Sequence, residues 1–77
     1  MSSEIPDIAR SAHRHGITDA QILHALHNPI RFAPINDEVS MVIGDDGSTG
    51  LIEVGMVDRH DRLVVIHAMP ARAKFLR

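Results

Sequence analysis

The chain has 77 residues, a formal net charge of −2 and no cysteine. Its length fits one small domain (residues 1–77) near the lower limit for a single hydrophobic core, and the missing cysteines exclude disulfides and thiolate zinc sites. The net charge argues against a wholly basic nucleic-acid-binding surface, although basic side chains gather in residues 54–77. No signal peptide and no apolar run of roughly 20 residues is visible, so we expect a cytoplasmic protein without membrane contact.

The N-terminal segment predicts a first helix over residues 5–15. Its apolar side chains recur at the spacing that lines one face of a helix: Ile5, Ile8, Ala9 and Ala12. Gly16 follows, and glycine is the usual residue just past a helix C-terminus.

A second helix is predicted between Thr18 and Asn28. Thr18 and Gln21 match the capping-box pattern, in which each side chain binds a backbone N–H freed at the helix start. Ile17 and Ile22 can pack together around this start. The helix should end at Asn28, because the residue before a proline disfavours the helical conformation.

After Pro29 the sequence has the period of β-strands. Residues 30–35 form a short predicted strand, and Pro34 marks it as an edge strand. Residues 38–43 form the next strand. The glycine-rich turn 44–50 that follows lacks the spacing and the lysine of a phosphate-binding loop.

Residues 51–57 and 62–69 predict a hairpin around the polar turn 58–61. If Val57 faces Arg62, alternation places seven side chains on one face: Ile52, Val54, Met56, Leu63, Val65, His67 and Met69. This face is apolar apart from His67, so we expect the helices to pack on it. The predicted fold class is therefore α+β, with two N-terminal helices packed on one face of a four-stranded antiparallel sheet.

Six histidines raise the question of a metal site. His13 and His15, or His24 and His27, could each bring two imidazoles together. Helical ligand pairs usually have a spacing of four residues and a nearby carboxylate, so we expect neither metal nor another cofactor.

His67 is the candidate for acid–base chemistry. Histidine side chains can donate or accept a proton near neutral pH, and Arg72 and Lys74 follow His67 closely as cations that could hold a phosphate. The alternative from the same pattern is a partly buried histidine with a structural role at the margin of the sheet.

Several short segments follow one another in a recognisable order along residues 12–74. They are Arg14-His15-Gly16-Ile17, the helix through Ala25, Asn28-Pro29, Ile43-Gly44 and Val65-Ile66-His67-Ala68-Met69-Pro70-Ala71. This order resembles that of BrnT-type toxins, small RNA-cleaving toxins of type II toxin–antitoxin systems. The resemblance implies a RelE/ParE-like fold, with the family's opening strand before the first helix missing here.

The resemblance also implies an activity. In this superfamily a ribose 2′-hydroxyl attacks the adjacent phosphate, which needs proton transfer and cationic stabilisation but no metal. Carried over residue by residue, it implies two sets of site residues: for catalysis His67, His15 and Arg72, and for RNA binding Arg14, Lys74 and Phe75. The implied partners are an RNA substrate and a cognate DNA-binding antitoxin protein, and self-association stays open.

Two departures from the family favour another class of function. Met69 stands where the family has an arginine before the final proline, and Val39 lies near another expected arginine. Their absence favours a non-catalytic module that only binds a protein partner. A third class, a metal-binding protein built on the histidine pairs, is the remaining alternative. For Phe75, a role in the core is the alternative to contact with an RNA base.

Overall fold

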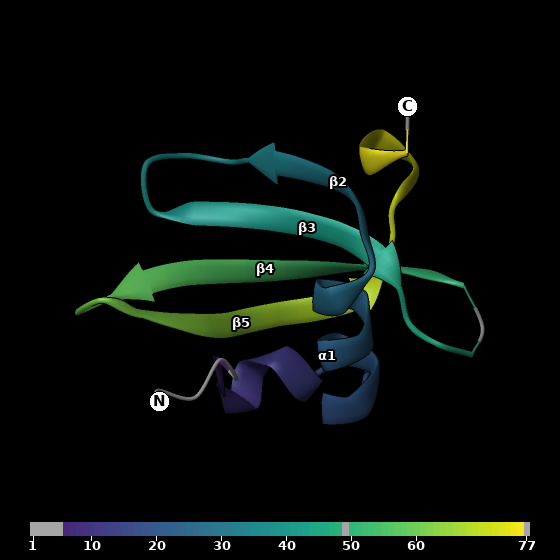
Figure 1. Ribbon diagram of the computed structural model, residues 1–77, viewed down its shortest axis with the longest axis horizontal. Coiled ribbons are helices and arrows are strands. Elements are labelled where there is room, and N and C mark those ends of the chain that lie inside the picture. Colours follow the sequence, from purple (N-terminus) through teal and green to yellow (C-terminus); the bar gives the residue numbers. More distant parts are fainter. Residues whose placement is uncertain (1–5, 49, 77) are drawn as a thin grey trace.

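The computed structural model describes residues 6–48 and 50–76 (Figure 1). The elements, in chain order, are β1 (Asp7–Ile8), the 3-10 turn η1 (Arg10–His13), α1 (Asp19–His27), β2 (Pro29–Pro34), β3 (Val39–Asp45), β4 (Leu51–Arg59), β5 (Arg62–Pro70) and the 3-10 turn η2 (Ala73–Phe75). The strands form one five-stranded sheet in the order β1-β5-β4-β3-β2. β1 runs parallel to β5, and the other neighbours are antiparallel.

This architecture corrects the predicted fold. The protein is α+β, but the expected pair of helices on a four-stranded antiparallel sheet is wrong. The described residues contain one α-helix and a five-stranded mixed sheet. The predicted edge position of the strand after Pro29 is confirmed, because β2 ends the sheet.

The segment predicted as the first helix forms β1 and η1 instead, and Ile5 lies outside the described residues. β1 adds to the free edge of β5, where the N–H of Ala9 donates to the carbonyl of Val65 at 2.8 Å. The Arg62 guanidinium also donates two hydrogen bonds to the Asp7 carboxylate. Ala12 is still fully buried, as the apolar spacing required, but from a different backbone conformation. Edge pairing therefore prevailed over helical periodicity in this short segment.

Helix α1 begins and ends as predicted. The Thr18 hydroxyl accepts the N–H of Gln21 at 3.1 Å, and the Gln21 side chain accepts the N–H of Thr18 at 2.9 Å. The helix packs closely on β3, where Gly44 leaves room for the backbone of Ala25. In Figure 1, α1 lies beside η1, and the C-terminal turn η2 lies well away from both.

The turn between β4 and β5 is tighter than predicted. Arg59 pairs with Arg62, so His60 and Asp61 alone connect the strands, both with positive φ. Two successive residues of this kind give the turn that matches the twist of a hairpin. Val57 therefore does not face Arg62, and the predicted register is wrong.

A bulge in β5 then changes the face on which His67 lies. Met56 pairs with Val65 and Gly55 pairs with His67, so Ile66 is an extra residue between the two pairs. Such an insertion reverses the alternation of side chains beyond it. His67 therefore lies on the face of the sheet opposite α1, and its predicted place under the helices is wrong.

Two groups of buried side chains cover the two faces of the sheet. The group under α1 and η1 comprises Ala12, Ile17, Ile22, Ala25, Ile52, Val54, Val65 and Ala68. The group on the other face comprises Met41, Ile43 and Phe75. Ile52, Val54 and Val65 thus occupy their predicted face, whereas Leu63 is half exposed.

Candidate functional site

Glu53, in the middle of β4, has a completely buried side chain on the face opposite α1. Its carboxylate lies 2.9 Å from Nε2 of His67 and 2.7 Å from Nη2 of Arg72. The backbone N–H of Arg72 also donates to it at 3.0 Å, and Nε of the same residue lies 3.1 Å from both carboxylate oxygens. A carboxylate taken out of water needs such partners, and here both are basic side chains.

The partners of Glu53 keep it ionised. Burial by itself raises the pKa of this carboxyl, but the hydrogen bonds from the Arg72 side chain and backbone and from His67 outweigh that effect, and the Arg72 charge adds to them. The pKa of Glu53 therefore lies below its usual range. In return, the hydrogen bond to Glu53 raises the pKa of the Arg72 guanidinium.

The bond to Glu53 also fixes the protonation pattern of the His67 ring. An ionised carboxylate can only accept hydrogen bonds, so Nε2 of His67 must carry the proton that lies between them. Nδ1 is then the ring atom that can accept a proton from a ligand. The ring packs close to Gly55, where an added Cβ would lie 3.1 Å from the His67 Cβ.

His15 reaches the same site from the corner between η1 and α1. Its ring centroid lies 5.9 Å from that of His67, with the rings nearly perpendicular. The corner is attached to β5 next to His67, because the Ser11 hydroxyl donates to the carbonyl of Ile66 at 2.7 Å. Gly16, with φ of 80°, turns the chain immediately after His15. Two imidazoles from distant parts of the chain therefore meet.

The C-terminal turn covers the neighbouring part of this face. Phe75 is buried against Met41 and Ile43, and the Arg72 guanidinium lies 5.5 Å from its ring centroid. Nζ of Lys74 lies 5.1 Å from the same centroid. Both cations therefore lie over the ring, a favourable electrostatic arrangement, while most of the ring's surface contacts the core.

The structure thus brings together the three residues predicted for catalysis, His67, His15 and Arg72. Lys74 and Phe75 are close to Arg72, whereas Arg14 lines a separate hollow beside η1. Their roles in RNA binding stay predictions.

The sequence reasoning missed Glu53, which joins His67 to Arg72. A signal for it existed, because Glu53 is the one charged residue in the apolar run of residues 51–57. A carboxylate inside a central strand is costly unless a basic partner meets it. The histidine and the arginine of the C-terminal segment meet this requirement.

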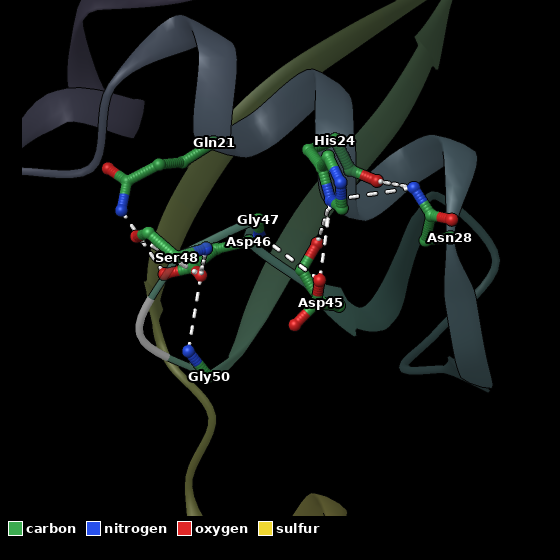
Figure 2. Close-up of polar contacts among 8 residues, drawn as sticks. All are labelled: Gln21, His24, Asn28, Asp45, Asp46, Gly47, Ser48 and Gly50. Atoms are coloured by element: carbon green, nitrogen blue, oxygen red, sulfur yellow. Dashed lines mark hydrogen bonds and ion pairs between the residues drawn. The ribbon is translucent and has the colours of Figure 1, made fainter.

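A second polar cluster joins α1 to the loop between β3 and β4 (Figure 2). Asp46 is buried and accepts hydrogen bonds from the side chain of Gln21 and the N–H groups of Ser48 and Gly50. These bonds hold the loop in its turn and attach it to the helix. The cluster therefore serves the fold rather than a ligand.

The histidine pairs weighed as metal ligands have separate partners. Nδ1 of His24 lies 2.7 Å from the carbonyl oxygen of Asp45, and Figure 2 shows the ring directed at Asp45. Nε2 of His13 lies 2.9 Å from the Asp19 carboxylate, while His15 is turned to His67. Within residues 6–48 and 50–76, no three histidine, aspartate or glutamate side chains are arranged to hold a metal ion.

The face of the sheet under α1 is only partly covered. An apolar hollow of about 470 Å³ lies beside the helix, lined by Pro6, Leu23, Leu26, His27, Pro29, Phe32, Val42, Met56 and Leu63. Phe32 and Leu63 are 61% and 50% exposed, respectively. One short helix thus leaves part of the apolar surface open to solvent.

Comparisons with protein families, with curated proteins and with solved structures found no match for this chain. Among the residues that the structure describes, no helix has both the length and the apolar character needed to cross a membrane.

Proposed function

We propose that this protein is a metal-independent ribonuclease that acts as the toxin of a type II toxin–antitoxin system. The observation that carries the proposal is that His67 and Arg72 both bind the buried carboxylate of Glu53, while His15 contacts the His67 ring. Two imidazoles and a guanidinium are the groups that cleavage of an RNA phosphodiester needs when no metal takes part.

In the proposed reaction the ribose 2′-hydroxyl attacks the adjacent phosphorus while its proton passes to an imidazole nitrogen. The 2′-O–P bond forms, the P–O5′ bond breaks, and the second imidazole gives a proton to the departing 5′-oxygen. The products are a 2′,3′-cyclic phosphate and a 5′-hydroxyl. Nδ1 of His67 is suited to take up the first proton, because Nε2 is held by Glu53. Arg72, whose side chain is 44% exposed, can stabilise the charge on the phosphate.

Two features bear on the Met69 position and on the missing opening strand, both of which depart from the BrnT pattern. Glu53 pairs in register with Met69, and the Arg72 guanidinium reaches Glu53. A guanidinium is therefore present beside the position where the family has its arginine. In addition, β1 supplies a strand before the helical segment, which the sequence did not suggest.

The proposal includes a protein partner. A toxin must be neutralised by its antitoxin, and the apolar hollow between α1 and β2 is the surface best suited to bind one. Exposed Phe32 would then be covered by the partner. RNA as substrate and such a partner both imply action in the cytoplasm.

The direct test is incubation of the purified protein with single-stranded RNA and with DNA of the same sequence. We expect cleavage of RNA alone, with 2′,3′-cyclic phosphate ends, because DNA lacks the attacking hydroxyl. His67→Ala and His15→Ala should each reduce the rate by at least about a hundredfold, the typical contribution of a general acid or base. His60→Asn, in the distant hairpin turn, is the matched control and should cleave like the parent.

A second function is favoured by a different observation. Glu53 offsets the charge of Arg72, which leaves less positive charge for RNA. The apolar hollow beside α1 offers a protein partner a surface to bind. A non-catalytic module that only binds a protein through the hollow would have this combination. In that case the parent should not cleave RNA and His67→Ala should leave partner binding unchanged, whereas Phe32→Ser should reduce partner binding.

A further inference from the structure

The Glu53–Arg72 pair leaves a nucleic-acid site short of positive charge. The guanidinium of Arg72 is matched by one buried carboxylate, so the pair is close to neutral. A single-stranded nucleic acid carries one negative charge per nucleotide, and neutralising these charges supplies most of its affinity for proteins. Cations without a carboxylate partner are therefore the ones that would hold such a chain.

Two such cations lie at the first residue of the 3-10 turn η1 and directly after its last residue. Arg10 and Arg14 line an open hollow of about 460 Å³ together with Ser11 and His13. Within residues 6–48 and 50–76, neither guanidinium forms a hydrogen bond or an ion pair, whereas Arg62 and Arg72 are each bound to a carboxylate.

The other groups of the hollow are already engaged. The Ser11 hydroxyl donates to the carbonyl of Ile66, and the His13 ring lies between the carbonyl of Ile17 and the carboxylate of Asp19. Asp19 is exposed, and its carboxylate lies against the His13 imidazole. Within the described residues the two arginines thus have no carboxylate partner, and their N–H donors are open to an anion.

The hollow is linked to the candidate site through backbone contacts of η1. Arg14 directly precedes His15, whose ring contacts that of His67. Ala9 and Ser11 each hydrogen-bond a backbone carbonyl of β5, at Val65 and Ile66, just before His67. A chain of phosphates bound near His67 would therefore extend naturally toward η1.

We propose that Arg10 and Arg14 form a phosphate-binding subsite for single-stranded nucleic acid, next to the His15–His67 pair. The two guanidinium groups bind backbone phosphates and not base edges, so the subsite supplies affinity without sequence preference. The inference extends the proposed ribonuclease function, and it rests on that function for the identity of the polyanion.

The test uses a fluorescein-labelled oligodeoxythymidylate of about twelve nucleotides, within the range of single-strand site sizes. It has no 2′-hydroxyl and cannot be cleaved, so binding is measured apart from activity. We expect Arg10→Ala and Arg14→Ala each to weaken binding about tenfold at low salt, as for loss of a charged hydrogen bond. Each should also reduce the slope of log affinity against log salt by about 0.7.

The matched control is Arg59→Ala at the tip of the β4–β5 hairpin. Arg59 is also exposed and its guanidinium forms no ion pair or hydrogen bond within the described residues, but it is not part of the hollow. Its removal should leave binding unchanged. An equal loss in this variant would show general attraction to basic groups and overturn the subsite, as would parent-like binding by Arg10→Ala and Arg14→Ala.

Absence of binding to the parent protein would overturn the subsite as well. Failure of the proposed function looks different. If the oligodeoxythymidylate binds through Arg10 and Arg14 but RNA is never cleaved, the subsite stands and the ribonuclease proposal falls. If RNA is cleaved through His67 while Arg10→Ala and Arg14→Ala bind the oligonucleotide normally, the ribonuclease proposal stands and the subsite falls.

Discussion

Nε2 of His67 lies 2.9 Å from the carboxylate of Glu53, on the neighbouring strand of the central hairpin. The bulge at Ile66 makes this contact, because it moves His67 onto the face that Glu53 occupies. The Glu53 carboxylate in turn holds Arg72 at the start of the C-terminal turn. One buried acid thereby fixes two of the proposed catalytic side chains.

Loss of the Glu53 charge should destabilise the protein and change its response to acid. Glu53→Gln keeps the size of the side chain but loses charged hydrogen bonds. This loss should lower the free energy of unfolding by about 2 kcal/mol at neutral pH. In the parent, the folded state holds the Glu53 pKa below its usual range, so the unfolded state takes up this proton first. The stabilisation is complete above the usual glutamate pKa of about 4.3 and is lost as pH falls through the lower folded value.

Chemical unfolding between neutral pH and about pH 3 measures this effect. The parent should lose more stability over the acid range than Glu53→Gln. Asp7→Asn is the control, because Arg62 likewise lowers the pKa of Asp7 through a hydrogen bond. That pair is more than half exposed, so its removal should change the acid profile much less. Identical profiles for the parent and Glu53→Gln would contradict the buried ion pair.

Because α1 and β3 pack closely at Gly44, adding one methyl group there should strongly destabilise the protein. In Gly44→Ala the new Cβ would overlap the carbonyl group of Ala25, and a helix backbone cannot move aside as a side chain does. We expect Gly44→Ala to lower the free energy of unfolding by about 3 kcal/mol or more. Gly16→Ala is the comparison, since its Cβ meets open space and only the positive φ of 80° is unfavourable. It should cost about 1 kcal/mol.

Local sequence rules predicted the parts of this fold whose hydrogen bonds are local. The capping box of Thr18, the end of α1 before Pro29 and the edge position of β2 all depend on neighbouring residues. The face of His67 depends on a bulge, and the conformation of Asp7 depends on an edge of β5 far along the chain. Periodicity cannot reveal either contact. His67 and Arg72 were already candidates from their residue types and their positions at the end of the last strand, and His15 came from the resemblance. Glu53, which holds His67 and Arg72 together, was missed.

The capping box itself is open to a direct test. Thr18→Ala removes the acceptor for the N–H of Gln21 and should lower the free energy of unfolding by about 1 kcal/mol. Thr18→Ser retains a hydroxyl and should be close to the parent. Chemical unfolding followed by circular dichroism compares the three proteins, and a full loss in Thr18→Ser would show that the methyl group matters rather than the hydrogen bond.

Removal of metal should leave the protein unchanged. The histidines that could have paired as ligands are bound elsewhere, His13 to Asp19 and His24 to Asp45. We therefore expect treatment with a chelator to change neither the melting temperature nor the RNA cleavage rate. Stoichiometric zinc or nickel in untagged protein, lost together with stability on chelation, would contradict this expectation.

Phe75 provides a way to separate a core residue from a base-stacking residue. Its ring is 8% exposed and packs on Met41 and Ile43, so Phe75→Ala should cost about 3 kcal/mol through lost burial and a cavity. Phe75→Leu retains most of the apolar volume and should cost less than about 1.5 kcal/mol. Because Phe75→Leu lacks the aromatic ring but should remain folded, its affinity for uncleavable oligonucleotide reports on stacking alone. We expect parent-like binding, since most of the ring is covered by protein. A drop of about tenfold or more, typical of a lost base–aromatic stack, would instead place Phe75 in the RNA contact.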